Sequence, residues 1–276
     1  MKLLITGHKG YIGGRLYEEL TNKGHDVCGI DLKDGDDILY CLPNKNFDYV
    51  FHLAAYPKVQ YSVENPSHSL RQNVFVTSRL LEWSKNHKVK RVVFSSSAAV
   101  NNGKPRSPYG LHKLMSEMEC KLYSEIYDID TVSLRYFNVY SKDQPYGGSY
   151  STVINSWMET LREGERLRID GDGTQTRDFI HLEDIISANV FCMKYEKDFN
   201  GKAIDVGSGC SVSLNEMKDS IEEYHDVEWD HFPNRKGDIR HSKADITELK
   251  KLGWKPEVDI KAGLKSCFHR NLKKFI

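Results

Sequence analysis

The N-terminal stretch decides the fold: Lys2–Thr6 reads KLLIT, and Gly7–Gly13 follows as GHKGYIG. The apolar run predicts a buried strand, and glycines at three-residue spacing predict a tight turn into a helix. An amphipathic segment, Tyr11 to Lys23, comes next, and a second strand, Asp26 to Ile30, ends at Asp31. In this order of elements such glycines bind the pyrophosphate of a dinucleotide at a helix N-terminus. In isolation they would mark only a turn and a close packing contact.

The end of the second strand bears on the choice between NAD and NADP. Asp31 is placed to accept hydrogen bonds from the adenosine ribose, and its charge would repel a 2′-phosphate. Lys9 favours the opposite choice, because an ammonium beside Gly10 can reach a 2′-phosphate, although it can equally be a solvated turn lysine. We expect NAD.

Composition excludes several other classes of function. The 276 residues include 39 Lys and Arg against 39 Asp and Glu, so the formal net charge is zero and favours neither nucleic acid nor an anionic membrane as a partner. The six cysteines are scattered without a C-x-x-C pair, so we expect reduced thiols, a cytoplasmic protein and no metal site. No apolar run approaches the roughly twenty residues that span a bilayer.

Alternating strands and helices predict an α/β fold, a Rossmann-like doubly wound parallel sheet with a smaller C-terminal substrate-binding lobe. Further strands are expected at Asp48–Leu53, Arg91–Ser95, Thr131–Arg135, Leu167–Ile169 and Ala203–Val206. Helices are expected at Asn65–His87, Tyr109–Tyr127, Val153–Glu163, Leu182–Tyr195, Leu214–Tyr224, Asp245–Leu252 and in an end segment Ile260–Phe275. We expect residues 1–140 to form the NAD-binding core, with returns near 178–206, and residues 141–276 to form mainly the lobe.

Three residues form a candidate proton-transfer set. Tyr109 and Lys113 are four apart at the start of a helix and share a face, and Ser97 lies at the carboxyl end of a strand, where open parallel sheets bind ligands. A phenol titrates near 10, so making it a base near neutrality takes roughly 4 kcal/mol. An ammonium about 5 Å away supplies roughly 3 kcal/mol at an effective dielectric near 20, and an oxidised nicotinamide adds a second positive charge.

With this set, Tyr109 would take a hydroxyl proton while a hydride leaves the same carbon. Ser97 would bond to the oxygen, and Lys113 would also hold the ribose. Taken alone, however, Tyr-x-x-x-Lys is common by chance, and serines at strand ends often only cap helices or turns.

A series of motifs runs through most of the chain. In order they are TGHKGYIG at 6–13, HLAA at 52–55, FSSSAAV at 94–100, SPYGLHK at 107–113, LRYFNVY at 134–140, GDGTQTRDFIHLEDI at 171–185, DVGSG at 205–209 and NRKGDIRHSKADI at 234–246. The chain thereby resembles the NAD-dependent sugar-nucleotide epimerase/dehydratase family of extended short-chain dehydrogenases/reductases. The resemblance implies an NAD domain and a lobe that binds a nucleoside-diphosphate sugar, with a UDP-sugar favoured.

Carried over by position, the resemblance implies a catalytic set and two binding sets. The catalytic residues would be Ser97, Tyr109 and Lys113. The cofactor would touch Gly7, Gly10, Tyr11, Ile12, Gly13, Asp31, Asp37, Ile38, Leu53, Ala54, Ala55, Asn73, Tyr109, Lys113 and Phe137. The substrate would touch Ser97, Tyr109, Asn138, Arg177, Arg235 and Asp238. Guanidinium groups suit diphosphate oxygens, whereas the alternative for the two arginines is surface ion pairing.

A few positions depart from the family pattern. Asn101 stands where a tyrosine is usual, Val76 where a glycine is usual and His112 where a serine is common. The loop 101–108 is shorter than in relatives. We expect these departures to alter substrate fit more than proton chemistry.

The residues after Ser97 bear on the reaction. Family members that eliminate water or decarboxylate need an extra acid there, and this chain has Ala98 and Ala99. The sequence therefore predicts an NAD-dependent epimerase acting at a sugar C4 through a transient 4-keto intermediate. The alternatives are an NAD(P)H-dependent 4-keto-6-deoxysugar nucleotide reductase, which Lys9 favours, and a non-catalytic cofactor-binding protein, which the short loop favours.

The resemblance also suggests a homodimer. The predicted helices at 65–87 and 109–127 would pair with their copies in a four-helix seam. Packing on their own sheet explains their apolar stripes equally well.

Overall fold

The computed structural model describes residues 1–145, 152–233 and 240–268. The chain divides into two compact units. Unit 1 comprises Met1–Tyr136 and Ile185–Asp205, and unit 2 comprises Phe137–Asp184 and the chain from Val206 onward.

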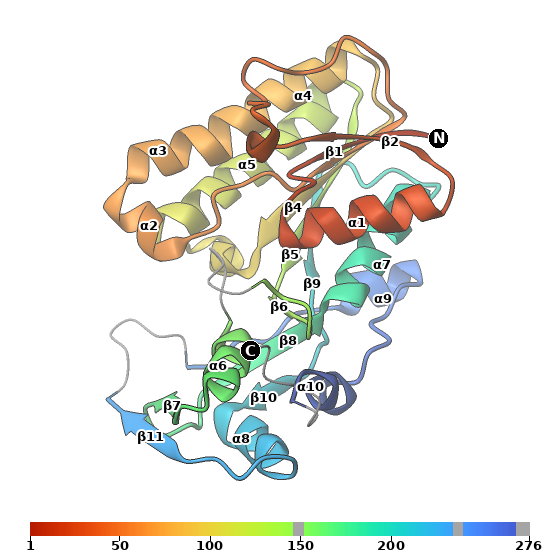
Figure 1. The fold of residues 1–276 in the computed structure, drawn as a ribbon. Coiled ribbons are helices and arrows are strands. Elements are labelled where there is room, and N and C mark those ends of the chain that lie inside the picture. Colours follow the sequence, from red (N-terminus) through yellow and green to blue (C-terminus); the bar gives the residue numbers. More distant parts are fainter. Residues whose placement is uncertain (146–151, 234–239, 269–276) are drawn as a thin grey trace. The chain divides into compact units, whose positions relative to one another are not determined.

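Unit 1 is built on a six-stranded sheet in the order β2-β1-β3-β4-β5-β9 (Figure 1). Its strands are β1 Lys2–Thr6, β2 Asp26–Ile30, β3 Tyr49–His52, β4 Arg91–Ser97, β5 Asp130–Tyr136 and β9 Lys202–Val206. The pairs from β2 to β5 are parallel. The chain moves to one side of β1 and then to the other, which creates the switch point where such sheets bind ligands. The predicted doubly wound α/β fold is confirmed.

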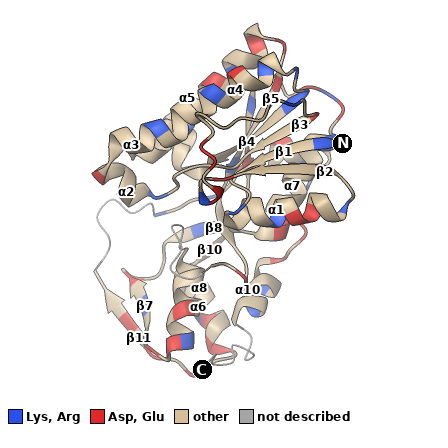
Figure 2. Cartoon of the chain, turned by 45° about the horizontal axis from the view of Figure 1, so that its top comes forward, with Lys and Arg blue, Asp and Glu red and all other residues tan. Residues whose placement is uncertain are grey.

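Helices cover both faces of this sheet, and Figures 1 and 2 show the same helices on each face. α1 (Tyr11–Asn22) and α7 (Leu182–Lys194) lie on one side, and α4 (Val76–Asn86) and α5 (Pro108–Ile126) lie on the other. Leu80 and Leu81 of α4 belong to the same buried cluster as Val50 and Val92 of the sheet. Acidic and basic residues are interspersed along these helices (Figure 2).

Short helical segments replace one of the longer helices expected from sequence. The predicted helix 65–87 consists of α3 (Pro66–Leu70), a π-helical turn (Arg71–Phe75) and α4, and α2 (Val59–Glu64) precedes them. The carbonyl of Asn73 in the π-turn accepts hydrogen bonds from the hydroxyls of Thr77 and Ser116, which accompanies the change in helical geometry. β2 is followed by a 3-10 turn, Leu32–Asp34, and β4 by another, Ala98–Gly103.

Unit 2 contains two small sheets. β6 (Asn138–Tyr140), β8 (Thr176–His181) and β10 (Ser211–Ser213) form one in the order β10-β8-β6, and β7 (Leu167–Asp170) pairs in parallel with β11 (Trp229–Phe232). The helices around them are α6 Val153–Glu163, α8 Leu214–Glu222, α9 Thr247–Leu252 and α10 Ile260–Phe268. A buried cluster that includes Trp157, Phe179 and Met217 forms the core.

One buried carboxylate ties three segments of unit 2 together. Asp178 of β8 accepts backbone hydrogen bonds from Ser208 (2.7 Å), Gly209 (3.0 Å) and Ala244 (3.1 Å). Burial raises the pKa of Asp178, and these hydrogen bonds oppose that effect. The motifs at 171–185, 205–209 and 234–246 therefore meet at this side chain.

Within the described ranges, every helix is too short or too polar to cross a membrane. The same residues contain no group of three or more His, Cys, Asp or Glu side chains arranged to hold a metal ion. All six cysteines are free thiols.

Candidate active site

The glycine turn after β1 lies in close contact with the loop after β3. Gly7 has φ +76°, and a Cβ on it would lie 2.7 Å from the backbone nitrogen of Ala54. A Cβ on Gly13 would lie 2.1 Å from the carbonyl oxygen of Gly7, so only glycine permits this approach. Helix α1 then begins at Tyr11 with no acidic residue in its first turn. The positive end of this helix, preceded by glycines that add no side chain, fits a pyrophosphate.

The carboxylate of Asp31 is fixed at the end of β2. Its oxygens accept hydrogen bonds from the backbone nitrogens of Lys33 and Lys9, both at 2.9 Å. The ammonium of Lys9 pairs with Asp34, whose other oxygen lies 3.4 Å from Nε2 of His8. The charge of Lys9 is thus balanced by a carboxylate within this turn, which favours NAD over NADP.

The remaining predicted cofactor residues occupy different environments. Asp37 accepts a hydrogen bond from Leu39 N (2.9 Å), and Ile38 is buried in the core of unit 1. Leu53, Ala54 and Ala55 are half-buried in the loop that borders the glycine turn. Asn73 is buried behind that loop, and Phe137 is buried in unit 2.

The fold brings the end of β4 and the start of α5 together. Ser97 ends β4, and its Oγ accepts a hydrogen bond from Ala99 N (3.1 Å). A Cβ on Gly110 would lie 2.3 Å from the carbonyl oxygen of Ala99, so the first turn of α5 packs directly on the turn that follows Ser97. Tyr109 and Lys113 belong to this part of α5.

Lys113 is the most unusual titratable residue of the set. It is buried, and its Nζ donates to the carbonyl oxygen of Ser95 at 2.7 Å. The ammonium lies 4.7 Å from the ring centroid of Phe94 and 6.0 Å from that of Tyr109, which is also buried. Desolvation lowers the pKa of Lys113 to about 7, and the charge of Glu117 partly opposes that effect.

A second buried charge, which sequence reasoning missed, holds α5 in place. Glu117 accepts hydrogen bonds from Nε (2.8 Å) and Nη2 (2.7 Å) of Arg135 and from the hydroxyl of Ser96. This bidentate pair joins α5 to β4 and β5 at the strand ends that precede the candidate catalytic residues. The available signal was spacing, because Glu117 follows Lys113 by one helical turn and Arg135 lies in the LRYFNVY motif.

The predicted substrate residues of unit 2 lie on neighbouring strands. Nδ2 of Asn138 in β6 donates to the carbonyl oxygen of Asp178 (2.7 Å), and Nη1 of Arg177 in β8 donates to that of Thr176 (2.9 Å). Arg235 and Asp238 lie outside the described residues.

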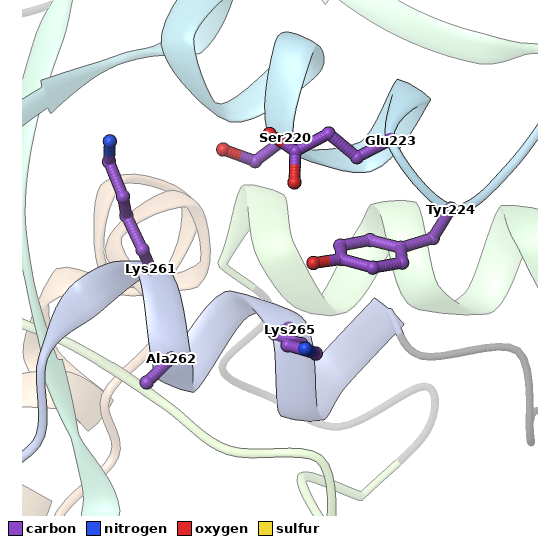
Figure 3. A pocket seen from close by; sticks show the side chains of 6 residues that line it. All are labelled: Ser220, Glu223, Tyr224, Lys261, Ala262 and Lys265. Carbon is purple, nitrogen blue, oxygen red and sulfur yellow. The ribbon is translucent and has the colours of Figure 1, made fainter.

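Unit 2 also contains a cavity of about 180 Å³ between α8 and α10 (Figure 3). Its lining consists of Ser220, Glu223, Tyr224, Lys261, Ala262 and Lys265. None of these residues belongs to the predicted site, so the candidate site is a different one.

A model of the NAD dependent epimerase/dehydratase family matches residues 3–207. The chain belongs to that family. A relative from Methanocaldococcus jannaschii named putative UDP-glucose 4-epimerase is 31% identical over 95% of this chain and 96% of its own. The resemblance seen in the motifs is therefore confirmed, and the family is one of NAD-dependent enzymes.

Two solved structures extend the comparison. The UDP-N-acetylglucosamine 4-epimerase from Methanobrevibacter ruminantium M1, in complex with UDP-N-acetylmuramic acid, is 31% identical with a TM-score of 0.87, covering 99% of this chain and 97% of that one. The UDP-glucuronic acid 4-epimerase from Bacillus cereus, in complex with UDP-glucuronic acid and NAD, is 29% identical with a TM-score of 0.84, covering 97% and 98%. Both likenesses extend over nearly the whole chain.

Replacing Lys113 should remove a pH dependence of stability in the cofactor-free protein. With a folded pKa near 7 against an ordinary 10.5, Lys113 binds more protons unfolded than folded between these values, so wild-type stability rises with pH there. The free energy of unfolding of the wild type, relative to that of Lys113→Met, should increase by about 1 kcal/mol per pH unit from about pH 7.5 to about pH 9. Urea unfolding across pH measures it, with exposed Lys121→Met as control. A gap that is constant with pH would contradict the assignment.

Freeing Lys9 should relax the preference for NAD. In Asp34→Asn the ammonium loses its partner and can pair with a 2′-phosphate, so the ratio of NADP to NAD affinity should rise about fivefold. Adding Lys9→Met should restore the wild-type ratio. Calorimetric titration of each protein with both dinucleotides measures it, and an unchanged ratio in Asp34→Asn would refute the role of the pair.

Proposed function

We propose that this chain is an NAD-dependent epimerase of a nucleoside-diphosphate sugar, most similar in function to a UDP-glucose 4-epimerase and acting at C4 through a transient 4-keto sugar. The observation that carries the proposal is the buried Lys113, hydrogen-bonded to Ser95 and 6.0 Å from the ring of Tyr109, on a helix packed against the turn after Ser97. The relative and the two solved structures reported above support the proposal, because each is named as a 4-epimerase of a UDP-sugar, the first as a putative one.

The chain's own residues handle the proton of the sugar hydroxyl. Tyr109 takes it at the phenolic oxygen and later returns it. The Lys113 ammonium, whose nitrogen lies 6.0 Å from the centroid of the Tyr109 ring, stabilises the phenolate by electrostatic attraction. Ser97 Oγ accepts a hydrogen bond from Ala99 N, and in this proposal its hydroxyl hydrogen is donated to the sugar oxygen. NAD, when bound, supplies the chemistry of taking a hydride and giving it back.

The residues around Ser97 favour epimerisation over elimination. Ala98 and Ala99 provide no acid or base for a neighbouring carbon. Glu117, a carboxylate on α5, is already bound to Arg135 and Ser96. The proton chemistry is therefore limited to the hydroxyl that Tyr109 serves.

The two units have different roles in this proposal. Unit 1 is the NAD-binding core, with the glycine turn, Asp31 and the loop 53–55 around the dinucleotide. Unit 2 is the substrate lobe, in which Asn138, Arg177, Arg235 and Asp238 hold the nucleotide diphosphate. The free cysteines suit a reducing compartment such as the cytoplasm.

Tyr109→Phe should lower epimerase turnover by at least about a hundredfold, because it removes the group that accepts the proton. Tyr123→Phe, half-buried on the same helix, is the control and should retain wild-type turnover. The assay follows interconversion of UDP-glucose, UDP-N-acetylglucosamine and UDP-glucuronic acid with their C4 epimers, without net NADH formation.

Other results would select the alternatives. Stoichiometric consumption of added NAD(P)H would identify a reductase. No interconversion across a broad nucleotide-sugar panel, with Tyr109→Phe unchanged in every assay, would indicate a non-catalytic cofactor-binding protein.

We also propose that the chain forms a homodimer through the exposed apolar face of α5 and the π-turn that precedes α4. Apolar side chains on this face are 45% to 64% exposed; they are Phe75, Leu111, Met118, Leu122 and Ile126. Packing on the sheet of unit 1 leaves these side chains accessible. The same face of a second copy of the chain would bury them.

Met118→Lys should therefore convert the dimer to a monomer, because an ammonium at the centre of the seam loses its hydration on association. Light scattering at micromolar concentration measures the mass. Glu18→Lys, which adds a lysine at an exposed position of α1, should remain dimeric. A monomeric wild type would rule out the dimer.

A further inference from the structure

A buried chain of hydrogen bonds crosses unit 1 behind the loop after β3. Oγ1 of Thr6 in β1 lies 2.7 Å from Nδ1 of His52 in β3, and Nε2 of His52 lies 3.0 Å from Oγ1 of Thr77 in α4. All three side chains are at most 1% exposed. Burial, followed by the nearby charge of Lys113, lowers the pKa of His52 to about 3, so its ring is neutral in the folded protein.

The donors and acceptors along this chain can be assigned. The hydroxyl of Thr77 donates to the carbonyl oxygen of Asn73 (2.6 Å), so it must accept from His52 Nε2–H. A neutral imidazole has one N–H, so Nδ1 accepts from the hydroxyl of Thr6. Oγ1 of Thr6 in turn accepts from the backbone nitrogen of Ala54 (3.3 Å). Each donor in this series of hydrogen bonds therefore has one assigned acceptor.

Both ends of the chain reach the loop 53–56. One end is the bond from Ala54 to Thr6. At the other end, Asn73 Oδ1 accepts from Tyr56 N (3.0 Å), and Nδ2 donates to Tyr56 O (3.3 Å). Ala54 is also the residue that a Cβ on Gly7 would strike. The loop is thus held at Ala54 and Tyr56 by buried hydrogen bonds, and it also contacts the glycine turn.

We infer that His52 is a positioning residue for the dinucleotide: through Thr6 and Thr77 its ring sets where loop 53–56 stands relative to the Gly7 turn. The inference rests on the proposed function, in which that turn binds NAD. His52 takes part in no proton transfer. A rigid ring with an acceptor on one side and a donor on the other spans β1 and α4 at a fixed separation, which a flexible polar side chain would not do.

Two threonine variants separate positioning from stability. Thr77→Val removes the hydroxyl that bonds His52, and Thr131→Val removes an equally buried hydroxyl that donates to the carbonyl oxygen of Cys120 (2.8 Å) without reaching the loop. Both should lose similar stability to urea. Only Thr77→Val should weaken NAD binding in calorimetric titration, by roughly fivefold to tenfold, and only it should speed hydrogen exchange at the Ala54 and Tyr56 amides.

Partial replacements of His52 give a second readout. His52→Asn keeps an acceptor near the Nδ1 position, and His52→Gln keeps a donor near the Nε2 position, whereas His52→Leu keeps neither. NAD affinity should fall in the order wild type, then Asn and Gln, then Leu, while turnover at saturating NAD stays near that of the wild type.

Equal NAD affinity and equal loop exchange in the two threonine variants would overturn the inference and leave the proposed function intact. A wild-type protein that binds no NAD would overturn both.

Discussion

The ammonium group of Lys113 is removed from water, and the packing of α5 on β4 and β5 makes that burial possible. Desolvation lowers its pKa to about 7, and the carbonyl of Ser95, the charge of Glu117 and the ring of Phe94 are the groups around it. They are effective only if α5 lies close against β4 and β5. The pair between Glu117 and Arg135 and the absent side chain at Gly110 permit that closeness. The geometry that keeps Lys113 buried therefore also sets Tyr109 beside the end of β4.

Local periodicity predicted some elements of both units well. The strand Asp26–Ile30 and the helix Val153–Glu163 of unit 2 were predicted at their observed bounds, because each has a clear period and a clear end. β6, β8, β10 and β11 were missed. They have three to six residues, and their pairing partners are distant in the sequence, so no local period marks them. The π-turn was missed for the same reason, since its bond from Ser116 comes from another helix.

The candidate site shows a similar division. Residues in recognisable motifs, such as Ser97, Tyr109 and Lys113, could be named from the sequence. Contacts between residues distant in the sequence could not be named, because the pairs Lys9–Asp34 and His52–Thr77 form only on folding. The open question of NAD or NADP depended on one such contact. Sequence placed a lysine where a 2′-phosphate would bind, and the structure supplies the carboxylate that pairs with it.

In the proposed reaction, Tyr109, beside Lys113, moves only a hydroxyl proton, and the hydrogen on C4 leaves and returns as a hydride. The most direct measurement is the fate of deuterium at C4 of a UDP-sugar that the protein epimerises in ordinary water. We expect the product to retain deuterium at C4 in full. Replacement of that deuterium by solvent hydrogen would contradict it.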